Sequence, residues 1–70
     1  MKVQYDSETD TLNIVLSEGK IVETDEEKSG VNIDYDKDGN IVEIEVLSAS
    51  KRVAHPNQMF YEAMAYKRAS

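Results

Sequence analysis

Hydrophobic and polar residues alternate over four stretches of this chain. The alternating apolar positions are Val3 and Tyr5, then Leu12, Ile14 and Leu16, then Val31, Ile33 and Tyr35, and finally Val42, Ile44 and Val46. A period of two residues is typical of strands that bury one face of a sheet. The segments between them are short and rich in turn-forming residues, which favours antiparallel neighbours over crossover connections.

Residues 31–47 give the most detailed prediction, which is a β-hairpin. The dipeptide Asp38-Gly39 can supply both positive φ angles of a two-residue type I′ turn, with Lys37 opposite Asn40. The register that follows pairs Tyr35 with Val42, Ile33 with Ile44 and Val31 with Val46. Every inward apolar residue then meets an apolar partner across the strands, which favours this register over a slipped one.

The strand around Ile21 has two alternatives. A plain turn at Glu18-Gly19 places Ile21 and Glu23 on the inner face, whereas a glycine bulge there places Val22 and Thr24 inside. We favour the bulge. The choice decides which side chains of this strand face the core.

Two helical segments are predicted after the sheet. Residues 48–53 favour a single helical turn, and residues 56–68 favour one short helix with an apolar stripe. So short a helix must pack against its own sheet or against a neighbouring chain. We expect a homodimer with the following interface residues: Met59, Phe60, Met64 and Tyr66.

These elements predict one α+β domain over residues 1–70. Residues 1–53 form a small antiparallel meander of four to five strands in sequence order plus the short helical turn, and residues 56–68 form the C-terminal helix. One sheet face carries Leu12, Ile14, Leu16, Ile33, Tyr35, Ile44 and Val46. A chain of 70 residues buries a small core, and without cysteine it has no disulfides, so oligomerisation is the remaining way to add stability.

Charge is unevenly distributed along the chain. Residues 1–50 hold four lysines against thirteen acidic residues, a formal charge of −9, whereas residues 51–70 hold four basic residues against Glu62, a charge of +3. A negative field repels phosphate backbones and attracts basic proteins. We therefore expect no nucleic-acid partner and favour a basic protein partner. The alternative is that the excess acid only keeps a small protein soluble.

Residues 34–45 match the residue pattern of a helix-flanked calcium-binding loop. That loop needs helices on both sides, but both flanks alternate as strands. In the hairpin register Asp34 faces Glu43, with Asp36 and Glu45 on the same outward face. Such a patch could bind a divalent cation or basic side chains, or be only a solvated face. The candidate metal ligands are Asp34, Asp36, Asp38, Glu43 and Glu45, and the candidate partner-binding residues are Asp34, Asp36, Glu43 and Glu45.

The chain offers little for catalysis. Ser48 and Lys51 have the spacing of a serine-lysine enzyme motif, but the companion motifs are missing and Ser48 fits a turn or cap residue. His55 is the only histidine, which excludes a multi-histidine metal site within one chain. We expect no catalytic residues, no cofactor and no enzymatic activity. Without cysteines, an export signal or an apolar span, we expect a cytoplasmic protein without membrane contact.

Four segments together resemble a known family: MKVQYD at 1–6, DTLNI at 10–14, GVNIDYD at 30–36 and GNIVEIEVLSAS at 39–50. Over residues 1–53 the chain resembles the prokaryotic domain-of-unknown-function family numbered 2283. The resemblance implies a small antiparallel sheet with a helix in a cytoplasmic protein of unassigned activity. It supplies no catalytic residues.

Two function hypotheses follow. The first is a non-enzymatic protein-interaction module that presents its acidic face to a basic partner, as an antitoxin does. The alternative is a divalent-cation (calcium) binding domain that uses the carboxylates of the hairpin at 34–45.

Overall fold

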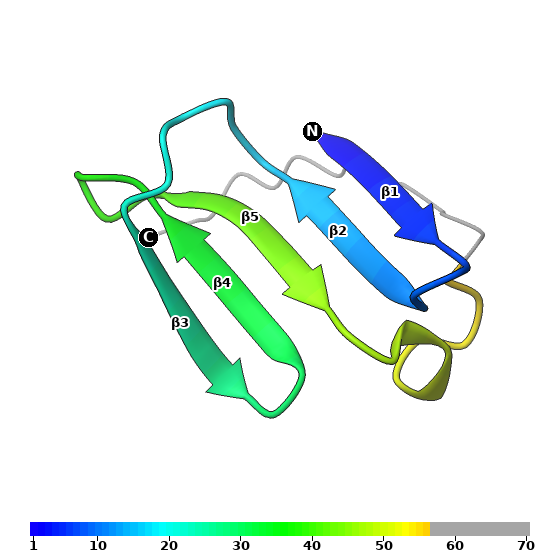
Figure 1. Ribbon diagram of the computed structural model, residues 1–70. Helices are drawn as coiled ribbons and strands as arrows, with labels where there is room; N and C mark the ends of the chain where they lie inside the picture. Colours follow the sequence, from blue (N-terminus) through cyan, green and yellow to red (C-terminus); the bar gives the residue numbers. More distant parts are fainter. Residues whose placement is uncertain (57–70) are drawn as a thin grey trace, which may run out of the picture.

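The computed structural model describes residues 1–56, which form a five-stranded sheet and one helical turn (Figure 1). The strands are β1 (Lys2–Asp6), β2 (Thr11–Val15), β3 (Glu23–Lys28), β4 (Val31–Tyr35) and β5 (Ile41–Val46), and the 3₁₀ turn η1 is Ala49–Lys51. The predicted helix over 56–68 and its interface residues Met59, Phe60, Met64 and Tyr66 lie outside this range. The part of the chain that the structure describes is therefore a β-sheet with one 3₁₀ turn, and it does not support the predicted α+β class.

Every strand pairs antiparallel with its neighbours, so the predicted antiparallel sheet is confirmed. The order within the sheet is β1-β2-β5-β4-β3 rather than the sequence order that we predicted. Strands β2 to β5 thus have a Greek-key order. The reason lies in β3, whose sequence ETDEEK offers no apolar side chain to the aliphatic residues of β2. Strand β5 offers Ile44 and Val46, and it takes the central position beside β2.

The sheet has one apolar and one polar face. Two rows cross the apolar face from β1 to β4: Val3, Ile14, Ile44 and Ile33, then Tyr5, Leu12, Val46 and Val31. Two rows cross the polar face from β1 to β3: Lys2, Val15, Glu43, Asp34 and Thr24, then Gln4, Asn13, Glu45, Asn32 and Glu26. In residues 1–56 only Leu12, Val42 and Ala49 are buried apolar side chains, because these residues form a single layer.

The β4–β5 hairpin confirms two of the three predicted pairs. Ile33 lies opposite Ile44 and Val31 opposite Val46, but Tyr35 lies opposite Ile41 instead of Val42. The predicted type I′ turn is wrong, because it needs a positive φ at both Asp38 and Gly39, and of these two residues only Gly39 has one (82°). Asp36 pairs with Asn40 around a three-residue loop, and the Gly39 N–H donates to the Asp36 carbonyl at 3.1 Å. The longer loop shifts the register by one residue at the start of β5.

The strand around Ile21 differs from the favoured bulge alternative. Thr24 lies on the polar face opposite Asp34, and Val22 is 57% exposed rather than inside. Both alternatives assumed a hairpin between β2 and β3. These strands are instead joined by a connection that crosses the ends of β5 and β4, where the Leu16 N–H donates to the Val42 carbonyl and the Val22 N–H to the Tyr35 carbonyl.

The predicted helical turn over residues 48–53 is confirmed as η1. The N–H groups of Arg52 and Val53 both donate to the Ala49 carbonyl, at 3.0 and 2.8 Å. Ser48 occupies the N-cap position with a left-handed φ of 53°, although its hydroxyl makes no capping bond. Within residues 1–56 no helix is long and apolar enough to cross a membrane.

Candidate functional site: an acidic patch on the polar face

Strands β3, β4 and β5 place four carboxylates on the polar face of the sheet. Asp34 lies directly opposite Glu43, and Asn32 separates Glu45 from Glu26 in the neighbouring row. We call Glu26, Asp34, Glu43 and Glu45 the acidic patch. Its members come from three adjacent strands because residues that pair across antiparallel strands point to the same side. The predicted position of Asp34 opposite Glu43 is thus confirmed.

Two neutral side chains orient carboxylates of the patch. The Thr24 hydroxyl donates to Asp34 Oδ1 at 2.5 Å, and the Asn32 amide Nδ2 donates to Glu45 Oε1 at 3.1 Å. Both donors come from cross-strand neighbours, so the sheet register itself brings them into place. Each bond leaves the second carboxylate oxygen of Asp34 or Glu45 available to accept from another molecule. Sequence analysis missed these donors because they depend on which strands become neighbours.

Asp36 does not belong to the patch, although the sequence pattern placed it there. Its Oδ1 accepts the backbone N–H groups of Asp38 and Asn40, both at 2.9 Å, and its Oδ2 accepts from the Asn40 amide at 3.3 Å. These bonds, first among them the one from the Asn40 backbone, lower the pKa of Asp36 below its usual range. The carboxylate therefore closes the β4–β5 loop. Asp38 lies exposed in the same loop.

The predicted metal ligands are not gathered around one point. In the range 1–56 no group of three or more acidic or histidine side chains is placed to hold an ion. Asp34, Glu43 and Glu45 share a face but extend along it, while Asp36 and Asp38 sit in the loop. The cation hypothesis consequently rests on the density of acidic residues in the sequence.

A hydrogen-bonded cluster around the single carboxylate of Asp10, which the sequence analysis missed, joins β1 and the β1–β2 turn to η1. Asp10 Oδ1 accepts from the Tyr5 hydroxyl at 2.7 Å and from the Ser50 N–H at 3.0 Å, and Oδ2 accepts from the Ser50 hydroxyl at 2.7 Å. We call Tyr5, Asp10 and Ser50 the Asp10 clasp. The bonds from Ser50 and then Tyr5 lower the pKa of Asp10, and the bond to Asp10 raises the pKa of Tyr5.

The clasp has the features of a structural element, because it holds the turn at Asp10 against η1. The Asp10 carbonyl also accepts the Ala49 N–H at 2.9 Å, and Asp10 itself has a left-handed φ of 54°. Asp10 and Ser50 are 40 residues apart, so the only signal in the sequence was an aspartate that ends a turn.

The Arg52 side chain fastens the same segment to the β3–β4 turn, which lies at the same end of the strands as the β1–β2 turn. Its guanidinium Nη2 donates to the carbonyl of Ser29 in the β3–β4 turn. The Leu47 N–H donates to the Gly30 carbonyl of that turn at 2.8 Å. The segment 47–52 therefore binds the turns of two hairpins.

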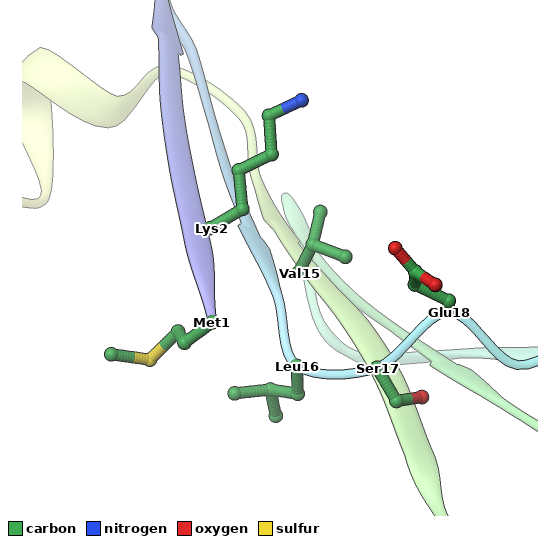
Figure 2. Close-up of a pocket in the computed structure, with 6 residues that line it drawn as sticks. All are labelled: Met1, Lys2, Val15, Leu16, Ser17 and Glu18. Atoms are coloured by element: carbon green, nitrogen blue, oxygen red, sulfur yellow. The ribbon is translucent and has the colours of Figure 1, made fainter.

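The surface is hollowed where the chain begins, at a site of about 350 Å³ between β1 and the end of β2. Figure 2 shows Met1 and Leu16 extending to one side of the sheet, and Lys2, Val15 and Glu18 to the other. The lining side chains do not converge on one centre as they do in small-molecule sites.

Comparison with known proteins identifies the family. Residues 2–50 match the model of the family described as "Protein of unknown function (DUF2283)". The chain belongs to this family. The match covers all five strands and the start of η1, and it confirms the resemblance seen in the sequence. No curated protein and no solved structure matched the chain.

Proposed function

We propose that this protein is a non-enzymatic interaction module that binds a basic protein partner on its acidic patch. The observation that carries the proposal is the direct opposition of Asp34 and Glu43 with Glu26 and Glu45 on the same face. Like charges directly opposite each other destabilise a sheet. A lysine or arginine from a partner would sit between these carboxylates and convert the repulsion into attraction.

The geometry supports basic side chains as the occupants. Adjacent strands lie about 4.8 Å apart and alternate residues of one strand about 7 Å apart, so neighbouring carboxylates are within reach of one guanidinium. Arginine donates in a planar fork that matches a carboxylate. Thr24 and Asn32 hold two of the carboxylates in place, which reduces the conformational entropy lost on binding.

The test is reversal of charge at two positions of the patch. The immobilised full chain should retain basic proteins from a cell extract in low salt, and the partner should then be identified and titrated against the pure chain. The variant with Glu43→Lys and Glu45→Lys should lose this binding, and the wild-type affinity should fall steeply with salt. The lysine at position 43 faces Asp34, so this variant should keep its fold.

The matched control carries the same change of net charge away from the patch. Glu8→Lys and Glu18→Lys lie in exposed loop positions and should leave binding nearly unchanged. Equal loss in both double variants would show that only the net charge matters. Retention of the partner by the Glu43→Lys and Glu45→Lys variant would refute the proposal.

A further inference from the structure

Strand β1 forms one edge of the sheet, and no described strand pairs with its outer side. In the described sheet it pairs only with β2, through the register from Lys2 opposite Val15 to Asp6 opposite Thr11. An unpaired edge presents a row of backbone donors and acceptors to which another strand can add. The side chains of β1 indicate which strand that is.

The sequence of β1, KVQYD, is complementary to itself in the antiparallel direction. When two copies are related by a two-fold axis at Gln4, Lys2 lies opposite the partner's Asp6 and Val3 lies opposite the partner's Tyr5. Gln4 then faces its own copy. The arrangement makes two ion pairs and two aliphatic-aromatic pairs, which are the cross-strand pairs that stabilise sheets.

This register also preserves the two faces of the sheet. Val3 and Tyr5 lie on the apolar face and Lys2 and Asp6 on the polar face, and antiparallel partners point to the same side. A shift by one residue would place Val3 opposite Gln4 and mix the faces. The Asp10 clasp already holds the Tyr5 ring, so its position is set before any partner arrives.

The opposite edge, β3, lacks this property. Its sequence ETDEEK has five charged side chains out of six, all six residues are exposed, and an antiparallel copy would place Asp25 opposite Glu26. Charged residues on an edge strand prevent edge-to-edge pairing. The two edges therefore differ in whether a second copy of this chain can add to them.

We infer that the chain forms a two-fold homodimer through its β1 strands, which joins two sheets into one sheet of ten strands. The partner is a second copy because β1 is complementary in charge to its own reversed sequence, whereas the other edge strand, β3, is not. The two acidic patches then lie toward the far ends of the joined sheet and remain accessible. A contact of five residues per chain is small, so the dimer should be weak and reversible.

The test pairs two charge variants of the full chain by sedimentation equilibrium. Lys2→Glu and Asp6→Lys each create two like-charge pairs in their own homodimer, and each should weaken dimerisation roughly tenfold. An equimolar mixture should dimerise as wild type does, because the mixed pair is complementary at both positions. The matched controls on the other edge, Lys28→Glu and Glu23→Lys, should dimerise normally.

In the wild-type chain the Asp6 carboxylate also accepts the Glu8 N–H, so Asp6→Lys removes a hydrogen bond of the turn. A cysteine cross-link provides a second measurement that does not depend on the stability of this variant. In a redox buffer Gln4→Cys should form a disulfide dimer, because facing residues on the two-fold axis are close enough to bridge. Asp25→Cys on β3 should stay reduced. A monomer at every concentration, no recovery on mixing, or equal cross-linking of both cysteine variants would overturn the inference.

Discussion

The two edge strands belong to one sheet and have nearly equal lengths, but their side chains differ in burial and in charge. Strand β1 alternates exposed and half-buried residues, whereas all six residues of β3 are exposed. The Asp10 clasp ties β1 and the β1–β2 turn to η1, while β3 is joined to the sheet by its pairing with β4. The comparison teaches that the two edges of one sheet can differ in composition, since β1 mixes apolar residues with both signs of charge while β3 is almost entirely charged.

Among the substitutions considered, the loss of Asp10 on the β1 side should lower the stability of the chain most. Asp10→Ala removes the acceptor of three hydrogen bonds and leaves alanine at a φ of 54°. We expect the Tm to fall by about 10 °C or more in thermal unfolding followed by circular dichroism. Asp10→Asn tolerates the same φ and should lie between this variant and wild type. An unchanged Tm for Asp10→Ala would show that the clasp contributes nothing.

Substitutions in the β3–β4 turn should lower the stability less. Gly30 in this turn and Gly39 in the β4–β5 loop have the same φ of 82°, so comparing them separates backbone strain from the loss of a contact. Gly39→Ala meets no atom within 4 Å and should cost about 1 kcal/mol from backbone strain. The new methyl group of Gly30→Ala would lie 2.8 Å from Arg52 Nη2 and displace it from Ser29, which adds about 1 kcal/mol.

Denaturant titrations in wild-type and Arg52→Ala backgrounds measure this difference as a double-mutant cycle. The excess cost of Gly30→Ala over Gly39→Ala should disappear in the Arg52→Ala background. An excess that persists there would assign the cost to the backbone of the turn instead.

The pH dependence of stability should distinguish the two sides of the sheet. Asp10 and Asp36 have lowered pKa values in the folded chain, so their contributions are present above the unfolded value of 3.8 and are lost as pH falls through the folded pKa. Tyr5 and Tyr35 have raised pKa values, so their contributions are present below 10 and are lost as pH rises through the folded pKa.

On the β1 side, two groups with shifted pKa values, Asp10 and Tyr5, bond to each other. The bond from Tyr5 lowers the pKa of Asp10, whereas burial first and then Glu27 raise the pKa of Tyr35, and backbone N–H groups hold Asp36. Tyr5→Phe should therefore reduce the loss of stability in acid, and Tyr35→Phe should alter only the alkaline side. Free energies of unfolding measured from pH 2 to 11 provide the comparison, and identical acid profiles for both variants would contradict it.

The smallest expected effect is a gain of stability in the acidic patch. Glu43→Gln removes the like charge opposite Asp34 and should stabilise the chain by about 0.5 kcal/mol in low salt. Glu18→Gln, in an exposed loop, should change nothing measurable. A loss of stability for Glu43→Gln would mean that the carboxylates of the patch do not repel each other in the folded chain.

Part of the candidate site was predictable because it follows from local pairing. The alternation around Ile33 and Ile44 sets the hairpin register, and that register alone brings Asp34 opposite Glu43. Asp36 was wrongly assigned to the polar face because its carboxylate accepts backbone N–H groups of the loop. The alternation of polar and apolar residues does not reveal such side-chain to backbone bonds. Thr24 and Asn32 were missed because side-chain donors matter only after the neighbouring strands are known.

The sequence by itself determined where β1, β2, β4 and β5 lie, that Ile33 and Val31 share a face with Ile44 and Val46, and that the first fifty residues are acidic. These properties depend on residues close together in the chain. Only the tertiary structure decided the strand order β1-β2-β5-β4-β3 and the Asp10 clasp. Both depend on residues tens of positions apart. These residues meet because the charged strand β3 offers no apolar residues to pair beside β2, whereas β5 does. The competition among strands for an apolar neighbour is a property of the whole sheet.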